Sequence, residues 1–535
     1  MNNTKASASV ILRHLLSCST IRNKAVLMAL LSLISFVFSI AIGYLCYLFV
    51  GPTSLGIWYN SYWICFFFLC GFLASSFFVF RHDIKTKPEN LFLAIVLSIT
   101  CFSSLSFNVN APSWDSGSHY RFVVEWSRLG SPVALSVTDI KMMELSSVDL
   151  YFNLSDLDNY ADTLNAESAF LDGSFARTNI VFGYKSIASH PATLVYVLLS
   201  LLPISFSSKY ILTRLIYAII YSLVTFTGMK QLRSGKMLYA VIALLPTAVF
   251  LASNYGYDYW VNAFILCSTA LLVRELQTPQ EPISLKRVFL IIGLFVAAMG
   301  PKAIYFPLVL LCLLVPRSKF SSPQASRLFR GAVLFACLFV VASFLIPFLH
   351  QGLSSGDPRG GEAVSPTEQV KFILSNPFEY ARILSSFLQT YCSLNTSASY
   401  INFYAYLGFS AWQYWVLVLF MMLFTAITDK SEVDKALCTW KSRVLSLTLS
   451  VVTIALVATS LYVAFTPVGS ETIAGCQPRY IIPVLFCTLI FLSSHRLAWP
   501  RENNRKKTMY NTAILGLMSF VLMAGLWQVY IGLLW

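Results

Sequence analysis

Long apolar runs separated by short polar segments follow one another along the chain. A membrane-spanning helix needs about 20 mainly apolar residues. Fourteen runs, several of them shorter than this, occupy residues 25–50, 59–80, 90–109, 191–206, 210–229, 236–254, 256–273, 287–300, 302–316, 330–350, 411–428, 443–466, 480–495 and 509–531. The pattern predicts an all-α protein, a polytopic transmembrane helix bundle in which residues 1–535 form a single integral membrane domain.

Positive charge between the runs predicts which connections share one side of the membrane. Seven segments hold 26 of the 38 Lys and Arg residues: 1–24, 81–89, 230–236, 274–287, 317–330, 430–443 and 496–507. Short basic loops stay cytoplasmic in membrane proteins. If the seven segments are cytoplasmic, the connections between them lie outside, and the predicted runs agree with this alternation except between residues 190 and 230. There, two runs connect an outer loop to a basic loop, and two crossings would place the basic loop on the outer side. Run 191–206, short and flanked by prolines, is therefore expected to be re-entrant or interfacial. About 13 spans remain, with the N-terminus inside and the C-terminus outside.

Two outer connections are long enough to hold structure of their own. Residues 110–190 form the first extracytoplasmic loop and residues 351–410 the second. Each contains amphipathic patterns, such as HYRFVVEWSRLG and VKFILSNPFEYARILSSFLQTY. Amphipathic helices of this kind lie in the membrane interface. The first loop is thus expected to be large and helical.

Composition agrees with a membrane protein and removes one alternative. The 535 residues are 57% hydrophobic and only 12% charged, against about 25% charged in soluble domains. The net charge of +14 could indicate nucleic-acid binding. The basic residues instead occur in clusters between apolar runs, so we expect membrane lipids and no nucleic acid as partners.

Against this background, the charged and polar side chains at the outer ends of the spans become informative, because such groups are costly in a membrane unless they serve a site or find a partner. They come from separate parts of the chain but share one predicted depth, which indicates one cavity opening outward. The set comprises Asp115, His119, His190, Arg214, Asp258, Lys302, Gln477 and Arg479.

These residue types suit group transfer from a phosphorylated lipid. Arg and Lys bind phosphate or pyrophosphate, and a carboxylate can serve as general base or metal ligand. Each residue also has a structural alternative. The cations could extend to lipid headgroups, the aspartates could cap helices, and the histidines could be structural.

Four segments, taken in order, resemble a family of uncharacterised bacterial multi-spanning membrane proteins. They are Asp115-x-x-x-His119, SNYGYD ending at Asp258, PKAIYFPLVLLCLLVP from Pro301, and CQPRYIIP around Arg479. The family carries P-D-E-x-x-H, a serine-to-aspartate stretch, K-x-x-Y-x-P-L and Q-G-R-Y-x-x-P, and it is similar in design to the glycosyltransferase-C superfamily. The resemblance covers roughly residues 90–495.

The resemblance implies a glycosyltransferase-C-like fold and an enzyme of the bacterial inner membrane. Such enzymes move a sugar from a polyprenyl-phosphate-type donor to an envelope glycan or lipid acceptor on the extracytoplasmic face. The resemblance implies that Asp115 is catalytic, because an acidic residue of the first outer loop typically has this role. From the shared depth and chemistry of the outer residues, we predict His119 as a second catalytic residue and the other six as substrate-binding. Two departures matter: Ser116 stands where the family has Glu, and Pro478 where it has Gly. The first puts a paired-carboxylate site for a divalent metal ion in doubt, so the metal requirement stays open.

Two other functions remain as alternatives. An O-antigen-type polymerase or ligase also has many spans, a large outer loop and outer arginines. A lipid-linked glycan transporter or flippase would show internal repeats and charges near the membrane midplane. The sequence shows neither repeats nor midplane charges, which favours the transferase.

Overall fold

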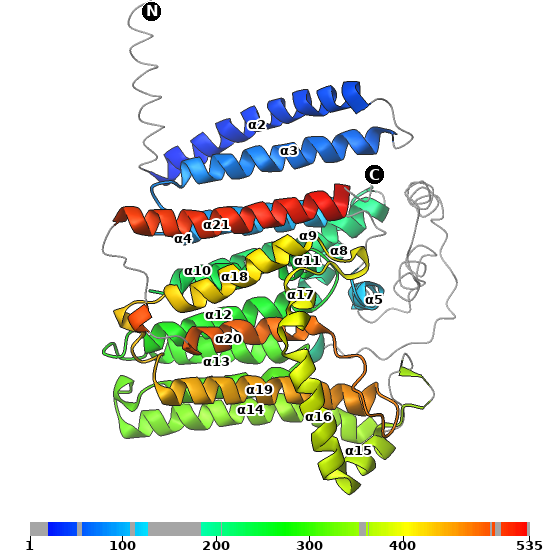
Figure 1. The fold of residues 1–535 in the computed structure, drawn as a ribbon, viewed down its shortest axis with the longest axis vertical. Coiled ribbons are helices and arrows are strands. Elements are labelled where there is room, and N and C mark those ends of the chain that lie inside the picture. Colours follow the sequence, from blue (N-terminus) through cyan, green and yellow to red (C-terminus); the bar gives the residue numbers. More distant parts are fainter. Residues whose placement is uncertain are drawn as a thin grey trace, which may run out of the picture.

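The computed structural model describes residues 20–50, 56–106, 113–126, 183–204, 206–351, 360–361, 363–492, 495–497 and 504–531. Every regular element in these ranges is a helix, and the apolar helices run side by side in one bundle (Figure 1). The α-helices are α2 (Ile21–Val50), α3 (Gly56–Val79), α4 (Pro88–Ser106), α5 (Ser116–Trp126), α8 (His190–Ser200), α9 (Phe206–Gln231), α10 (Lys236–Ala243), α11 (Pro246–Ala252), α12 (Asp258–Leu276), α13 (Leu285–Met299), α14 (Pro323–Gln351), α15 (Pro366–Ser375), α16 (Pro377–Tyr391), α17 (Leu394–Ile401), α18 (Trp412–Thr428), α19 (Trp440–Ala464), α20 (Ile482–Leu492) and α21 (Asn504–Leu526). Short 3₁₀ segments are η2 (Tyr184–Ser186), η4 (Arg317–Lys319), η6 (Ala405–Leu407), η7 (Glu432–Asp434), η8 (Pro478–Ile481) and η9 (His495–Leu497), while η3 (Ala303–Leu314) is a long one and η10 (Trp527–Ile531) is a π-helix.

Seven of the described helices are long and apolar enough to cross a membrane: α2, α4, α9, α12, α14, α19 and α21. Shorter apolar helices include α8, η3, α18 and the continuous η8–α20 segment. The prediction of an all-α membrane protein is confirmed. The count of about 13 spans stays a prediction, because several of the predicted runs form helices too short to cross by themselves.

Helix α8 agrees with the expectation for run 191–206. Its 11 residues extend about 16 Å at 1.5 Å per residue, about half the thickness of the hydrocarbon core. It packs against α5 and α9. The long helix α9 follows it and is long and apolar enough to cross a membrane. That only one of the two runs crosses stays a prediction.

The predicted run 236–254 is broken where Pro246 enters it. α10 ends at Ala243, and Leu245 adopts an extended ψ of 130° before the proline. Proline has no backbone N–H, and it disfavours the helical conformation of the residue before it. The predicted run 302–316 contains Pro307 and forms the 3₁₀ helix η3 over 12 residues, whereas runs longer than three or four residues are uncommon.

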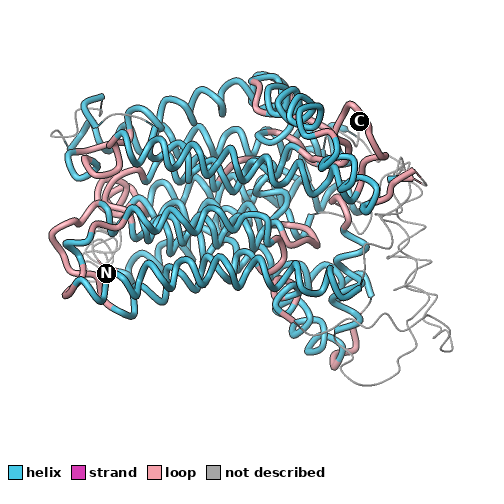
Figure 2. Tube along the Cα trace, turned by 90° about the horizontal axis from the view of Figure 1, so that it is seen from below, coloured by secondary structure: helices cyan, strands magenta, loops and turns pink. Residues whose placement is uncertain are grey.

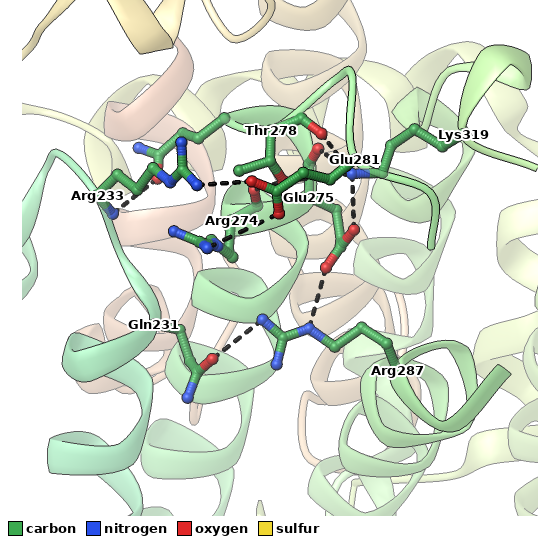
Figure 3. A network of polar contacts seen from close by, with 9 residues as sticks. Gln231, Arg233, Arg274, Glu275, Thr278, Glu281, Arg287 and Lys319 are labelled. Carbon is green, nitrogen blue, oxygen red and sulfur yellow. Dashed lines mark hydrogen bonds and ion pairs between the residues drawn. The ribbon is translucent and has the colours of Figure 1, made fainter. Parts of the chain in front are cut away.

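The described parts of the seven basic segments meet at one end of the bundle, called the basic end below. Ion pairs join Lys24 to Asp83 at 2.6 Å and Lys236 to Glu89 at 2.6 Å. Figure 3 shows the centre of this end, where Glu275 binds both Arg287 and Lys319. A further contact adds segment 430–443, where Gln277 donates to Asp434, and Asn511 of α21 donates to the carbonyl of Ile84. Carboxylates and one amide thus connect the basic loops.

The opposite end, called the site end, carries the helices predicted for the two long loops. The described parts of the first loop are residues 113–126, which include α5, and residues 183–190, which include η2; residues 127–182 lie outside the described residues. In the second loop α15 and α16 replace the single predicted amphipathic stretch, with a break before Pro377. In Figure 1, α15 and α16 run obliquely to the parallel helices of the bundle. Figure 2 shows the molecule turned by 90°, with the connecting loops at the two ends of the bundle. Their location in a membrane interface stays a prediction.

Candidate functional site

Four charged side chains from separate segments come together at the site end. Asp115 precedes α5, Asp258 opens α12, Lys302 lies in the turn between α13 and η3, and Arg479 is in η8. Arg479 is the centre of the group, and we call these four residues the charged cluster. They are separated by up to 364 positions in the sequence but occupy one place in the fold.

The guanidinium of Arg479 lies between the two carboxylates. Its Nε is 3.2 Å from Oδ2 of Asp258, and its Nη2 is 3.8 Å from Oδ2 of Asp115. The Arg479 side chain is 2% exposed, Asp258 15% and Asp115 30%. Nε and Nη1 of Arg479 are buried without a hydrogen bond of good geometry. A buried guanidinium with unused donors can bind a further anionic oxygen.

Asp115 has an unusual backbone conformation. Its φ is +59°, in the left-handed region where non-glycine residues are uncommon and Asp is among the tolerated types. Its carbonyl accepts the amide of His119, the first bond of α5. The conformation lets the chain turn into α5 while the carboxylate stays at the edge of the cluster, partly open to solvent.

Asp258 lies in the first turn of α12. The preceding residue, Tyr257, is the N-cap, and no side-chain cap bond is formed there. A carboxylate at this position is stabilised by the positive end of the helix dipole. The Asp258 carboxylate therefore interacts with both the helix N-terminus and Arg479, and its side chain is less exposed than that of Asp115.

Lys302 places its ammonium group among aromatic rings. Nζ is 2.9 Å from the ring centre of Tyr480, 5.6 Å from that of Tyr257 and 6.0 Å from that of Tyr305. It is buried and has no hydrogen-bond partner. Cation–π attraction offsets part of the cost of burying the charge. This arrangement leaves all three N–H donors of Lys302 available for a ligand.

Hydrogen bonds hold the backbone on both sides of Arg479 in place. The hydroxyl of Tyr391 in α16 donates to the carbonyl of Gln477 at 2.6 Å, and Tyr305 donates to the carbonyl of Tyr480 at 2.9 Å. Pro478 occupies the first position of η8, where a fixed φ and a missing N–H cost nothing. Proline in place of the family's glycine is thus compatible with this backbone. The amide oxygen of Gln477 is buried without a partner.

The remaining three predicted residues lie at the same end, outside the ion pairs described above. The ring of His119 packs edge-on against Tyr257, with centroids 4.9 Å apart. His190 opens α8 and its Nε2 is 3.3 Å from the hydroxyl of Ser186. Arg214 donates to the carbonyl of Ser104 at 2.8 Å and is 1% exposed.

Four aromatic residues of the site were missed by the sequence analysis. They are Trp114, whose ring lies 4.3 Å from the guanidinium carbon of Arg479, and the three tyrosines around Lys302. Three of the four are sequence neighbours of a charged residue: Trp114 precedes Asp115, Tyr257 precedes Asp258, and Tyr480 follows Arg479. The available signal was an aromatic residue directly beside three of the four charged residues of the cluster.

The cluster offers limited support for a metal ion. Within the described ranges, no group of three or more His, Cys, Asp and Glu residues could hold one. Asp115 and Asp258 both face the guanidinium of Arg479, which occupies the position between them. Ser116, at the position of the family's Glu, directs its hydroxyl to the carbonyl of Tyr255 at 3.4 Å. The metal requirement therefore stays open.

Comparisons with known proteins give a family and no activity. No curated protein and no protein of solved structure matches the chain. One family model, described as "Predicted membrane protein (DUF2142)", matches residues 176–488. This range covers more than half of the chain and contains Asp258, Lys302 and Arg479, while Asp115 precedes it. The chain therefore belongs to the DUF2142 family of predicted membrane proteins.

Proposed function

We propose that this protein is a membrane glycosyltransferase. It moves a sugar from a polyprenyl-phosphate-type lipid donor to an envelope glycan or lipid acceptor at the site end of the bundle. The proposal rests above all on one observation: the charged cluster combines two carboxylates with two cations that keep unused hydrogen-bond donors.

The chemistry of sugar transfer requires both kinds of group. The acceptor oxygen attacks the anomeric carbon and the bond from that carbon to the donor phosphate oxygen breaks. The bonding electron pair leaves with the phosphate, where negative charge grows, and the acceptor hydroxyl gives up its proton. A nearby carboxylate can take this proton, and fixed cations stabilise the growing charge. Attack opposite the leaving group inverts the anomeric centre.

Exposure distinguishes the two carboxylates. Asp115 is twice as exposed as Asp258 and lies farther from the guanidinium. An acceptor can approach it from solvent, so we assign the general base to Asp115. Asp258 is closer to Arg479 and holds it in place. The ring of His119 lies beside that of Tyr257, and we assign His119 to positioning the acceptor.

The two cations also receive different roles. Arg479 is shared by two carboxylates, which orient it and neutralise part of its charge. Lys302 has no carboxylate at ion-pair distance among the described contacts and holds three unused donors. We therefore assign the first contact with donor phosphate to Lys302, with Arg479 adding its unused Nη1. Gln477, with an unpaired amide oxygen, suits a sugar hydroxyl, and His190 and Arg214 support the surrounding segments.

The alternatives share part of this chemistry. A polymerase or ligase would use the same donor class and differ in the acceptor, which must be a glycan chain. A flippase would bind lipid-linked sugar without breaking the glycosidic bond. Turnover measured with purified protein and a panel of polyprenyl-phosphate sugars separates transfer from transport.

The first prediction tests the assignment of the base. Asp115→Asn keeps the shape of the side chain and removes its basicity, so turnover should fall about 100-fold or more, the usual size of a general-base effect. Donor affinity should change little. Transfer rate and donor affinity are measured with purified protein in nanodiscs. Glu471→Gln, an exposed acid in the loop before η8, is the matched control and should keep wild-type turnover. Wild-type turnover in Asp115→Asn would refute the assignment and transfer the role to Asp258.

The second prediction concerns Arg479. Arg479→Ala removes a charged group that contacts substrate before and during reaction, so donor affinity and turnover should both fall. Arg479→Lys should restore only part of each, because a point charge replaces a planar fork. Retained donor affinity in the alanine variant would contradict a phosphate contact.

A further inference from the structure

A polar cavity lies at the basic end, and none of its lining residues belongs to the charged cluster. Its volume is about 260 Å³. Four segments line it: the loop before α4, the connection from α9 to α10, the end of α18, and the first turns of α21. The lining residues are Thr86, Pro88, Leu232, Arg233, Ser234, Lys236, Asp429, Lys507 and Asn511.

Cations outnumber carboxylates in this lining. Three basic residues, Arg233, Lys236 and Lys507, face a single acid, Asp429. The Asp429 carboxylate is already used, because it accepts the backbone N–H groups of Met237 and Leu238 at the start of α10. The cavity therefore presents a positive surface with its one negative group turned to the backbone.

The existing ion pairs leave capacity for a ligand. Arg233 pairs with Glu281 (Figure 3), but these side chains are 41% and 56% exposed, and a pair in contact with water contributes little. Lys236 pairs with Glu89 through one of its three donors. Arg233 can thus exchange a weak, exposed ion pair for an incoming anion. Lys236 can bind an anion through its two other donors and keep its pair with Glu89.

From this lining we infer that the cavity binds a phosphate group, carried by the headgroup of an anionic membrane phospholipid. Its size agrees with a small group, since pockets for drug-sized molecules measure about 300–1,000 Å³. A cavity of about 260 Å³ accommodates a phosphodiester headgroup.

The location favours a lipid over soluble phosphate. The lining residues lie at or beside the ends of apolar helices. The ends of membrane-spanning helices lie at the depth of the lipid headgroups. Basic pockets between spanning helices on the cytoplasmic side bind such headgroups. The acyl chains would extend along the apolar surface of the bundle. The inference does not depend on the proposed glycosyltransferase activity, because it concerns the opposite end.

The test measures ligand protection of the full-length protein. Detergent-purified protein is heated with short-chain phosphatidylglycerol, with short-chain phosphatidylcholine, or with inorganic phosphate, and the unfolding midpoint is followed. Phosphatidylglycerol should raise the midpoint and phosphatidylcholine should not. In Arg233→Gln/Lys507→Gln the concentration needed for half of this effect should rise about tenfold or more, as expected for the loss of charged hydrogen bonds.

Controls come from basic residues next to the cavity. Lys506 is exposed beside Lys507, and Lys286 is exposed at the same end, so Lys506→Gln/Lys286→Gln removes the same charge without touching the lining. This variant should retain wild-type protection. Equal loss in both double variants would mean a general charge effect and overturn the proposal. Protection by inorganic phosphate equal to that by phosphatidylglycerol would overturn the lipid as the source. No protection of the wild type by phosphatidylglycerol would overturn the site itself.

Discussion

At the scale of single residues, Lys302 shows how the cluster depends on burial. Its ammonium nitrogen has no hydrogen-bond partner, and three tyrosine rings surround it. Burial, opposed by the charge of Asp258, lowers the pKa of Lys302 to about 7. The residue lies in the turn between α13 and η3, where a ligand phosphate would restore the charged form.

The third prediction follows from this shift. The pKa of Lys302 is lower in the folded than in the unfolded protein, so the unfolded state holds more protons between about pH 7 and 10.5, and stability from this group rises with pH over that window. Below pH 7 the full cost of the buried charge is present. Lys302→Met should therefore raise the unfolding midpoint more at pH 6 than at pH 9. The control is Lys441→Met, at an exposed position of α19, which should show no such difference. A stabilisation independent of pH would contradict the buried charged form.

The sequence predicted the charged residues of the site better than their surroundings. Asp115, Asp258, Lys302 and Arg479 stand out because charge is rare near apolar runs, and the structure brings all four together. The relative distances of the two carboxylates from Arg479 could not be predicted. Which carboxylate lies closer to Arg479 depends on the left-handed turn at Asp115 and on packing between distant helices.

At the scale of elements, Asp429 joins two helices of the basic end. It follows α18, and its carboxylate accepts the N–H groups of Met237 and Leu238 in the first turn of α10. The side chain is 2% exposed. Capping by a buried carboxylate satisfies donors that a helix start otherwise leaves unpaired.

The fourth prediction concerns this cap. Asp429→Ala should destabilise the protein by about 1–3 kcal/mol, the cost of leaving buried donors unsatisfied. Asp429→Asn, which keeps an acceptor oxygen, should lose less. Thermal unfolding in detergent measures both, with Glu432→Ala as control, because Glu432 is 77% exposed and forms an ion pair with the exposed Lys435. An alanine variant as stable as the wild type would show that the α18–α10 junction does not depend on the cap.

Helix existence was predictable at this scale and helix continuity was not. Runs of apolar residues predicted the seven long helices, because hydropathy averaged over a span is insensitive to detail. The same averaging concealed the break at Pro246 and the 3₁₀ geometry around Pro307. Both changes come from the backbone, through a missing N–H and a clash with the preceding turn.

At the scale of the whole molecule, charge divides the bundle into two ends. Basic loops and their carboxylate partners form one end, from Lys24–Asp83 to Gln277–Asp434. The charged cluster and helices α15–α17 form the other. This separation agrees with the alternation of basic and non-basic connections in the sequence.

The fifth prediction fixes the direction of insertion. Loops rich in Lys and Arg stay on the cytoplasmic side during insertion, so we expect the basic end inside and the charged cluster outside. The structure supplies exposed probe positions: Lys435 at the basic end is 68% exposed and Arg382 of α16 is 63% exposed. On a Cys-free background, a membrane-impermeant thiol reagent added to intact cells should label Arg382→Cys, and it should reach Lys435→Cys only after permeabilisation. Leu338→Cys, at a 68% exposed apolar position of the candidate span α14, should react in neither case, because we expect its thiol to lie in hydrocarbon. Labelling of Lys435→Cys in intact cells would reverse the orientation. It would also place the charged cluster in the cytoplasm, where an extracytoplasmic acceptor could not reach Asp115.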